Sequence, residues 1–437
     1  MQQDTTVFRK SFSRRTFLQS TVAAFAAPVV VPSSVLGANS PNERINVGVI
    51  GTGNQSRIDL PSFLNKDDVQ VNAVCDVNTG SYGYAHKDHF LGREPAKKLV
   101  DKFYADKTGS GSYKGCAAYN DFRKIIDRSD IDVVVIIVPD HWHALMTIMA
   151  AKAGKDIYCE KPLSLTIDHG KRMVAAVRKH KRILQTGSHF RSGPSNRFGC
   201  ELVLNGRIGK LKRIRTSLAP NNKVGPGPGW KPMPVPEGFD YETWIGPAPM
   251  VPYHKDRCLY RFRFNLDYSG GQMTNFGAHS NDIAQLGNGT SLTGPIEYEP
   301  VKVVWPPKGS LFTTAEFSHF RARYANGVLL ECKTDEKWQG TRFEGTEGWV
   351  QFDFGGLHTH PKSLATSKIG PNEIHLPKSY EGQEKDVYRN YIPDHVRNFL
   401  DSVKSRKDPI EPVEIGHRTA TICHSGNICL QLNRKLK

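Results

Sequence analysis

Three polar residues in the second half of the chain have the spacing of one helical face. Asn275, His279 and Asp282 lie at positions i, i+4 and i+7 of a stretch that follows Gly270 and Gly271. Residues with this spacing share one side of an α-helix. A histidine can exchange a proton near neutral pH, whereas a neutral amide can only hold a hydrogen bond. The pattern therefore predicts a polar site on this face of the helix.

A second group of residues has the pattern of a phosphate-binding turn. The apolar run at 45–50 leads into Gly51-Thr52-Gly53-Asn54-Gln55-Ser56. Gly51 permits a tight bend, and Gly53 lets backbone amides approach a pyrophosphate at the positive end of the next helix. Ser56 replaces the third glycine of the usual fingerprint and is still small. We expect Gly51, Gly53, Asn54 and Gln55 to bind a dinucleotide.

An acid stands at the position that such a fold uses for ribose. The second apolar strand, at 69–75, ends in Asp76, which lies 23 residues after Gly53. A carboxylate there accepts hydrogen bonds from the adenosine ribose and repels a 2′-phosphate, so NAD is favoured over NADP. The alternative is that Asp76 only caps the turn beside Asn78.

The third strand ends in a histidine-rich loop. It spans residues 131–138 and stops at Pro139-Asp140-His141-Trp142-His143. Ligands of open parallel sheets bind at the carboxyl ends of the strands. We therefore expect Pro139 and His143 to lie against the nicotinamide half of the cofactor. Trp142 could instead be a core residue, and His143 could cap a helix.

The fourth strand, at 156–159, leads into Glu160-Lys161-Pro162. With this turn, the glycine turn and the Pro-x-x-x-His loop, the chain resembles the glucose-fructose oxidoreductase and inositol dehydrogenase family, Gfo/Idh/MocA. The resemblance runs from Ile45 almost to the C-terminus, through Gly206-Arg207-Ile208-Gly209 and a final helix at 422–432. It is stronger over the first domain than over the second.

The resemblance assigns roles to the residues already singled out. It implies that Lys161 meets the reacting hydroxyl and stabilises the alkoxide, with Glu160 beside the cofactor. The family pattern Asp-x-Gly-x-His-x-x-Asp makes His279 the acid/base, matches Asp282, and has an acid where this chain has Asn275. A neutral amide cannot support an imidazolium or act as a base, so His279 must carry the proton transfer. The alternative for His279 is a purely structural histidine.

Candidates for substrate contact are aromatic or basic. Aromatic rings stack on the apolar face of sugars. The loop-rich stretch at 220–252 and its surroundings offer such rings, which could equally pack in the core: Trp230, Trp244 and Tyr253. Three arginines could bind hydroxyls or a carboxylate: Arg191, Arg261 and Arg263. We expect Arg191, Asp282 and Trp230 to contact the substrate.

Residues 1–38 have the parts of a cleavable twin-arginine leader. Ser13-Arg14-Arg15-Thr16-Phe17-Leu18 precedes a weakly apolar run at 22–31 with small residues near Ala38. The run is too short to span a bilayer, and its alternative is an amphipathic helix. We therefore expect an exported, periplasmic protein without stable membrane insertion. Because this pathway carries folded proteins, the cofactor would be bound before export and held tightly.

The rest of the chain is too long for one hydrophobic core, so two domains are expected. We predict an α/β protein, with a Rossmann domain at 43–165 and an α+β domain at 166–437. Alternating runs at 321–325 and 348–352 indicate a large, mostly antiparallel sheet in the second domain. One face of that sheet could form the interface of a homo-oligomer, a dimer or a tetramer.

Charge and cysteine content narrow the remaining classes. Of the net charge of +16, the leader's four basic residues and one acid contribute +3, which leaves +13. This charge could attract anionic substrates or only aid solubility, and no nucleic-acid motif accompanies it. The eight cysteines form no C-x-x-C pair, which argues against a zinc ribbon or a thioredoxin-like centre. We predict no metal site.

These observations predict an exported oxidoreductase. It would transfer hydride between a secondary hydroxyl of a sugar, polyol or sugar derivative and a tightly bound NAD, which reduction of a second sugar could recycle in place. Two alternatives remain: a redox-cycling glycosidase or epimerase, and a non-catalytic NAD-binding protein. Family hydrolases tend to lack the Glu-Lys-Pro turn, and a binding protein would be expected to lose Lys161 or His279, so both features favour the dehydrogenase.

Overall fold

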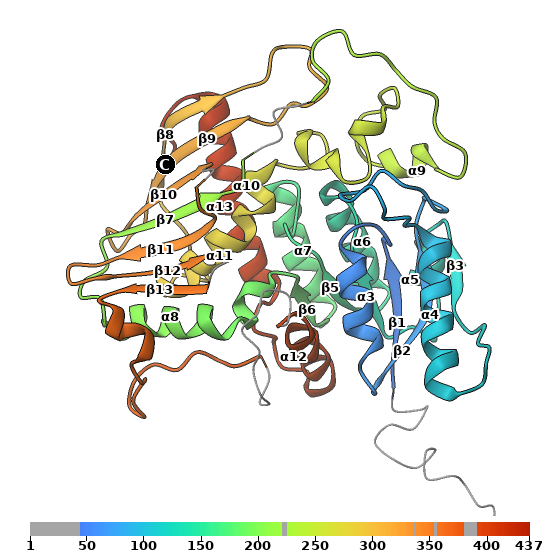
Figure 1. Cartoon of the computed structure of the whole chain (residues 1–437), viewed down its shortest axis with the longest axis horizontal. Coiled ribbons are helices and arrows are strands. Elements are labelled where there is room, and N and C mark those ends of the chain that lie inside the picture. The colour runs from blue at the N-terminus through green and yellow to red at the C-terminus, as the bar shows by residue number, and fades with distance from the viewer. Residues whose placement is uncertain (1–43, 221–224, 335–336, 354–355, 380–390) are drawn as a thin grey trace, which may run out of the picture. The chain divides into compact units, whose positions relative to one another are not determined.

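The computed structural model describes residues 44–437 except 221–224, 335–336, 354–355 and 380–390. The predicted leader lies outside these residues, so export stays a prediction. Within the described ranges, no helix is both long enough and apolar enough to cross a membrane. The described chain contains two β-sheets with helices around them, as Figure 1 shows.

The first sheet has six parallel strands in the order β3-β2-β1-β4-β5-β6. Its strands are β1 (Ile45–Ile50), β2 (Val69–Cys75), β3 (Ala117–Tyr119), β4 (Val133–Ile136), β5 (Asp156–Cys159) and β6 (Leu184–Thr186). Strands such as β4 are buried along their whole length, which explains their continuous apolar sequence. The strand order reverses between β1 and β4, and ligands of such sheets bind at this point.

Helices surround the first sheet: α3 (Ser56–Leu64), α4 (Arg93–Thr108), α5 (Arg123–Ile126), α6 (Asp140–Lys152) and α7 (Ile167–Lys179). A helix from the end of the chain, α12 (Ile392–Ser405), packs on α3 and contributes Phe399 to the same core as Phe63. Both β6 and α7 lie beyond residue 165. The first sheet therefore extends past the predicted domain boundary, and the chain returns to it near its end.

The second sheet has seven strands in the order β13-β12-β11-β7-β10-β9-β8. They are β7 (Arg213–Leu218), β8 (Glu297–Val304), β9 (Phe317–Arg323), β10 (Leu329–Thr334), β11 (Gly340–Glu344), β12 (Trp349–Asp353) and β13 (Gly356–His360). Only β7 and β10 pair in parallel, so the sheet is mostly antiparallel, as predicted.

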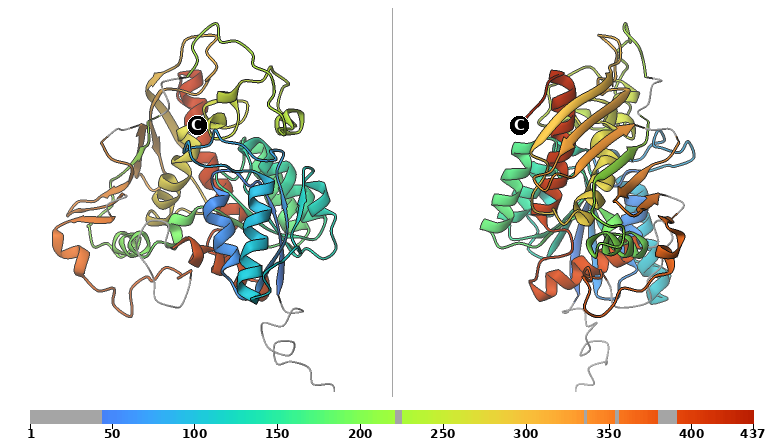
Figure 2. Two further views of the ribbon diagram at one scale, coloured as in Figure 1. Left: turned by 45° about the vertical axis from the view of Figure 1, so that its right-hand side comes forward. Right: turned by 90° about the vertical axis from the view of Figure 1, so that its left-hand side faces the viewer.

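The two faces of the second sheet differ. One face packs on α8 (Pro194–Leu204), α11 (Gly277–Gly287) and α13 (Val413–Leu432), and its side chains, such as Phe320, Leu330 and Phe343, are fully buried. In the right-hand view of Figure 2 the strands lie in front of these helices, so the other face is open. That face carries a network of ion pairs around Glu331 and Glu344.

The loop-rich segment between β7 and α10 (Gln272–Asn275) returns to the first sheet. Its short helices are α9 (Tyr241–Ile245), η3 (Lys255–Arg257) and η4 (Arg261–Phe264). The Thr79 amide donates to the Gly238 carbonyl over 2.8 Å, and the Asn120 amide group donates to Asp240 over 2.6 Å. Seven buried side chains, including Trp244 and Tyr253, form a separate apolar cluster in this segment. The segment thus covers the end of the first sheet where a cofactor would lie.

Candidate active site

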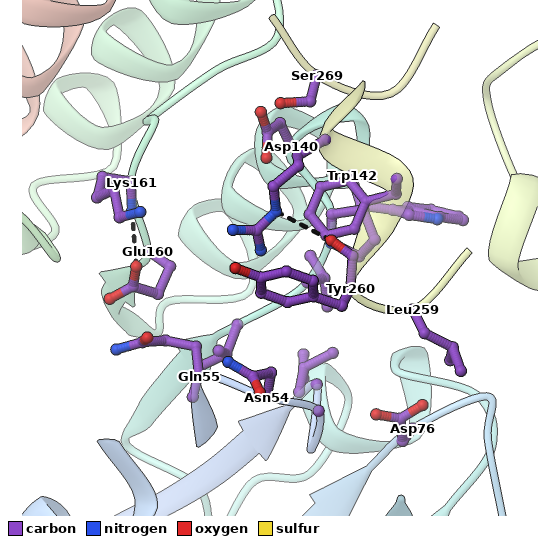
Figure 3. Close-up of a pocket in the computed structure, with 18 of the residues that line it drawn as sticks. Asn54, Gln55, Asp76, Asp140, Trp142, Glu160, Lys161, Leu259, Tyr260 and Ser269 are labelled. Atoms are coloured by element: carbon purple, nitrogen blue, oxygen red, sulfur yellow. Dashed lines mark hydrogen bonds between the residues drawn. The ribbon is translucent and has the colours of Figure 1, made fainter. Parts of the chain in front are cut away.

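A cavity of about 330 Å³ lies where the two halves of the fold meet. Its wall comes from the carboxyl ends of the first sheet, the loop-rich segment, and α10 and α11. In Figure 3, Asp76 and Lys161 stand at opposite ends, with Asn54 and Gln55 between them. This succession is the one that a dinucleotide requires: a ribose ligand, a phosphate turn and a reactive group.

The glycine turn has the backbone geometry that a pyrophosphate needs. Gly51 has φ +92°, and a Cβ atom there would fall 2.0 Å from the Ile137 carbonyl oxygen, so only glycine fits. At Gly53 a Cβ atom would meet the ring of Tyr84 at 3.0 Å. The Oδ1 atom of Asn54 is buried and has no hydrogen-bond partner among the described residues. The turn therefore fits a dinucleotide at the N-terminus of α3.

Asp76 both lines the cavity and braces the turn. Its Oδ2 accepts hydrogen bonds from the Thr52 amide (2.7 Å) and hydroxyl (3.1 Å), and its Oδ1 accepts from the Asn78 amide (2.8 Å). Burial raises the pKa of Asp76 although these hydrogen bonds oppose the shift. Asp76 therefore does cap the turn at Asn78, the alternative that we considered, and it also lines the cavity.

The loop after β4 divides its residues between the cavity and the interior. Pro139, Asp140 and Trp142 line the cavity, and the Trp142 indole also donates to the Trp244 carbonyl over 3.0 Å. His143 does not line the cavity, contrary to our prediction of cofactor contact. It follows Trp142 by one residue on α6, which turns it toward the interior.

His143 instead links the turn that carries Lys161 to the end of β4. Its Nδ1 lies 2.8 Å from the Pro162 carbonyl oxygen and its Nε2 lies 2.9 Å from that of Val138. Burial lowers the pKa of His143, but Cys159, Asp140 and the Pro162 carbonyl together raise it to about 10. A protonated ring can donate to both carbonyls and so fixes the turn.

The reactive end of the cavity joins two segments that are 114 residues apart. The Lys161 ammonium donates to Asn275 Oδ1 over 2.8 Å, while Asn275 Nδ2 donates to Gln272 Oε1 over 2.7 Å. Burial lowers the pKa of Lys161, and the charge of Glu160 opposes the shift. The sequence placed Asn275 in the catalytic group but did not assign it a partner. Its side chain bonds to Lys161.

His279 lies on the cavity wall one turn further on. The single helix predicted here is divided into α10 and α11, and His279 stacks on Phe190 with ring centroids 4.5 Å apart. Burial and the Lys161 charge hold the pKa of His279 well below its usual range. Its Nδ1 has no hydrogen-bond partner among the described residues. The ring is therefore neutral, which is the form that accepts a proton.

The three residues expected to contact substrate lie outside the cavity wall. Arg191 and Asp282 form a buried two-pronged ion pair with both N–O distances at 2.7 Å, and the Thr419 hydroxyl also donates to Asp282. The pair joins η2 (His189–Ser192) to α11. Trp230 packs by the small apolar cluster at Phe264 and Phe312, 5.0 Å from the Arg257 guanidinium.

A buried titratable cluster next to Lys161 was missed from sequence. Asp59, Glu160 and His189 have side-chain ligand atoms within 4.8 Å of one another. Burial and the Glu160 charge raise the pKa of Asp59 well above its usual range, and burial raises that of Glu160 to about 7. The two buried carboxyls therefore oppose each other's ionisation. Only the fold brings the three residues together, and no local motif marks Asp59.

The match to protein families agrees with this geometry. Residues 45–188 match the family model described as oxidoreductase family, NAD-binding Rossmann fold, and residues 226–362 match its C-terminal alpha/beta domain. The chain belongs to the Gfo/Idh/MocA oxidoreductase family. Its first domain is a NAD-binding Rossmann domain, and the Gfo/Idh/MocA match ends at residue 188, beyond our predicted boundary.

Curated relatives match only part of the chain. A glycosyl hydrolase family 109 protein of Saccharopolyspora erythraea is 29% identical over 39% of this chain and 38% of its own length. A levoglucosan dehydrogenase of Pseudarthrobacter phenanthrenivorans is 38% identical over 22% of this chain and 25% of its own length. The chain thus spans well under half the length of these relatives.

Solved structures share the fold over most of the chain. Levoglucosan dehydrogenase in complex with NADH and levoglucosan has a TM-score of 0.62 and 18% identity, covering 90% of this chain and 98% of that one. Aldose-aldose oxidoreductase from Caulobacter crescentus has a TM-score of 0.59 and 20% identity, covering 90% and 99%. At this identity the likeness concerns the fold alone.

Proposed function

We propose that the protein is an exported, NAD-dependent oxidoreductase that acts on a secondary hydroxyl of a sugar, polyol or sugar derivative. One observation carries the proposal: Lys161 and His279 converge on the cavity that also contains the glycine turn and Asp76. A proton acceptor and an ammonium beside a dinucleotide site are what alcohol oxidation requires.

The chain's own residues supply the acid/base part of the reaction. When bound, NAD supplies the acceptor for the hydride. Lys161 donates a hydrogen bond to the substrate oxygen and stabilises the negative charge that develops there. His279, neutral and on the opposite segment, takes the hydroxyl proton. Asn275 orients Lys161 through the 2.8 Å hydrogen bond without adding charge.

The choice of a sugar or polyol rests on the relatives. Levoglucosan dehydrogenase and aldose-aldose oxidoreductase carry sugar names, and both share this fold. The choice of NAD over NADP rests on Asp76, since a carboxylate at the end of β2 repels a 2′-phosphate.

A second candidate is a glycosidase that oxidises its sugar transiently. Relatives named glycosyl hydrolase family 109 and alpha-N-acetylgalactosaminidase favour it, at 29% and 26% identity over 39% and 41% of the chain. Such an enzyme would restore the cofactor in each cycle, so it would release no reduced cofactor.

Purified protein separates the two candidates. We would identify bound nicotinamide by absorbance and mass, then follow NADH at saturating NAD with a panel of sugars and polyols. Net NADH formation supports the dehydrogenase. Release of p-nitrophenol from p-nitrophenyl α-N-acetylgalactosaminide without net NADH supports the glycosidase. Bound cofactor with neither reaction would contradict both.

A further inference from the structure

One cation of the cavity has no role in the proposed chemistry. Arg263, in η4, lines the cavity together with Lys161. Its Nε donates to the Tyr260 carbonyl over 2.9 Å, the contact drawn as a dashed line at Tyr260 in Figure 3. Its guanidinium carbon lies 4.1 Å from the centroid of the Tyr260 ring. These contacts hold the guanidinium plane in place while occupying one of its five N–H donors.

The remaining donors of Arg263 are not used by the protein. Among the described residues, Arg263 forms no ion pair and no hydrogen bond other than the one to Tyr260. Burial lowers its pKa, which Tyr260 and Asp140 oppose. Asp140 also lines the cavity, but it forms no ion pair with Arg263 among the described residues. Within the described part of the chain, the guanidinium is thus a cation with no directly paired acid.

The second cation of the cavity, Lys161, also lacks an ion-pair partner among the described residues. The Lys161 ammonium bonds to the neutral Asn275, where the family pattern has an acid, and the charge of Arg263 further lowers the pKa of Lys161. Glu160 is the acid that most raises the pKa of Lys161, and its own pKa of about 7 leaves it only partly ionised near neutral pH. Two cations therefore face one cavity, and neither is ion-paired to an acid in the part of the chain that the structure describes.

We propose that Arg263 binds an anionic group of a ligand in this cavity, a carboxylate or a phosphate. The planar fork of arginine matches both groups, and charge-assisted hydrogen bonds of this kind are among the strongest in proteins. Two ligands carry such a group. If it is the carboxylate of a sugar acid, the inference rests on the proposed function. If it is the pyrophosphate of the cofactor, the inference is independent of the proposed function.

The chain offers a matched control two residues away. Arg261 also lies in η4, but it does not line the cavity, and its Nη1 donates to Asp256 over 2.7 Å. Its side chain is 42% exposed. Loss of Arg261 removes an arginine of the same short helix without changing the cavity wall.

The test compares Arg263→Met, Arg263→Lys and Arg261→Met with the wild type. We would measure NADH affinity by fluorescence titration, and then the affinity of NADH-loaded protein for glucuronate and for glucose by calorimetry. These sugars differ in whether C6 is a carboxylate. Thermal melting checks that each variant is folded. Arg263→Lys keeps the charge but loses the fork, so its effect should be the smaller of the two.

The outcomes distinguish the two ligands. Loss of glucuronate affinity by about tenfold to a hundredfold in Arg263→Met, with glucose and NADH unchanged, identifies a substrate carboxylate. A loss of the same size in NADH affinity identifies the cofactor phosphate. If neither changes more than in Arg261→Met, the inference is wrong. Failure of the wild type to bind or oxidise any sugar contradicts the proposed function, while the NADH titration still decides the role of Arg263.

Discussion

At the scale of single residues, the proposed chemistry depends on two side chains from distant segments. Lys161→Met keeps most of the aliphatic stem but removes the ammonium, and His279→Gln keeps a polar group but removes the base. We expect each to lower kcat by on the order of 10²-fold or more. Steady-state kinetics checks this, with NADH affinity near normal. The exposed Lys171→Met is the control. Full activity in His279→Gln would mean that the proton goes elsewhere.

Asn275→Asp tests the contact between Asn275 and Lys161. A carboxylate within 2.8 Å of the ammonium stabilises its charged form, so it raises the pKa of Lys161. Charged Lys161 is the active form in our mechanism, and it is lost as pH rises through its pKa. The alkaline limb of the pH–kcat profile should therefore move to higher pH. Asn275→Ala, which adds no charge, is the control. Movement of the acidic limb alone would show that His279 responds instead.

Asp76 is the residue that should select the cofactor. Asp76→Ala removes the ligand for ribose and the charge that repels a 2′-phosphate. We expect NADH affinity to fall by about tenfold and the preference for NADH over NADPH to shrink, as measured by fluorescence titration with both cofactors. Asp76→Asn keeps an acceptor for Thr52 and so isolates the charge. An unchanged preference in both variants would contradict the assignment.

At the scale of elements, α12 is held to the first domain by Asp68, which precedes β2. Asp68 accepts hydrogen bonds from Arg397 and Lys404, both on α12, and burial opposes but does not prevent the lowering of its pKa to about 2. A depressed carboxyl pKa stabilises the folded state above the unfolded pKa of about 4, and this stabilisation is lost as pH falls toward 2.

Asp68→Asn should therefore lower the free energy of unfolding by about 2 kcal/mol at pH 7. The difference in this free energy between the wild type and the variant should become smaller below about pH 4. Urea denaturation at several pH values measures it. Asp67→Asn removes an exposed pair with Lys107 and should cost less than about 0.5 kcal/mol. Equal effects of the two substitutions would show that the ion pairs of Asp68 with α12 do not stabilise the fold.

At the scale of the whole molecule, the twin-arginine motif predicts that the folded protein is exported. Replacing Arg14 and Arg15 together by Lys should leave folded, cofactor-loaded protein in the cytoplasm, because the twin-arginine pathway recognises the pair. Cell fractionation and the nicotinamide content of each fraction measure this, with Arg9→Lys as the control. Export of the double variant at the normal level would contradict the prediction that the protein is exported folded with its cofactor bound. Assembly into a homo-oligomer through the open sheet face also stays a prediction.

The residues of the cofactor half could be predicted from sequence because their signals are local. A strand buried on both faces needs a continuous apolar run, and the glycine turn must follow it directly. Gly51, Gly53 and Asp76 therefore lie on the cavity wall as expected. The presence of a second, mostly antiparallel sheet also follows from such patterns.

Tertiary structure decided the partners of the polar side chains. Helical periodicity placed His279 and Asp282 on related faces, but Asp282 meets Arg191, 91 residues away, and His279 meets the cavity. Arg261 and Arg263 look alike in sequence, yet one pairs with Asp256 and the other faces the cavity. A sequence period specifies the direction of a side chain from its own element. What lies opposite depends on packing between segments far apart in the chain, which no local pattern records.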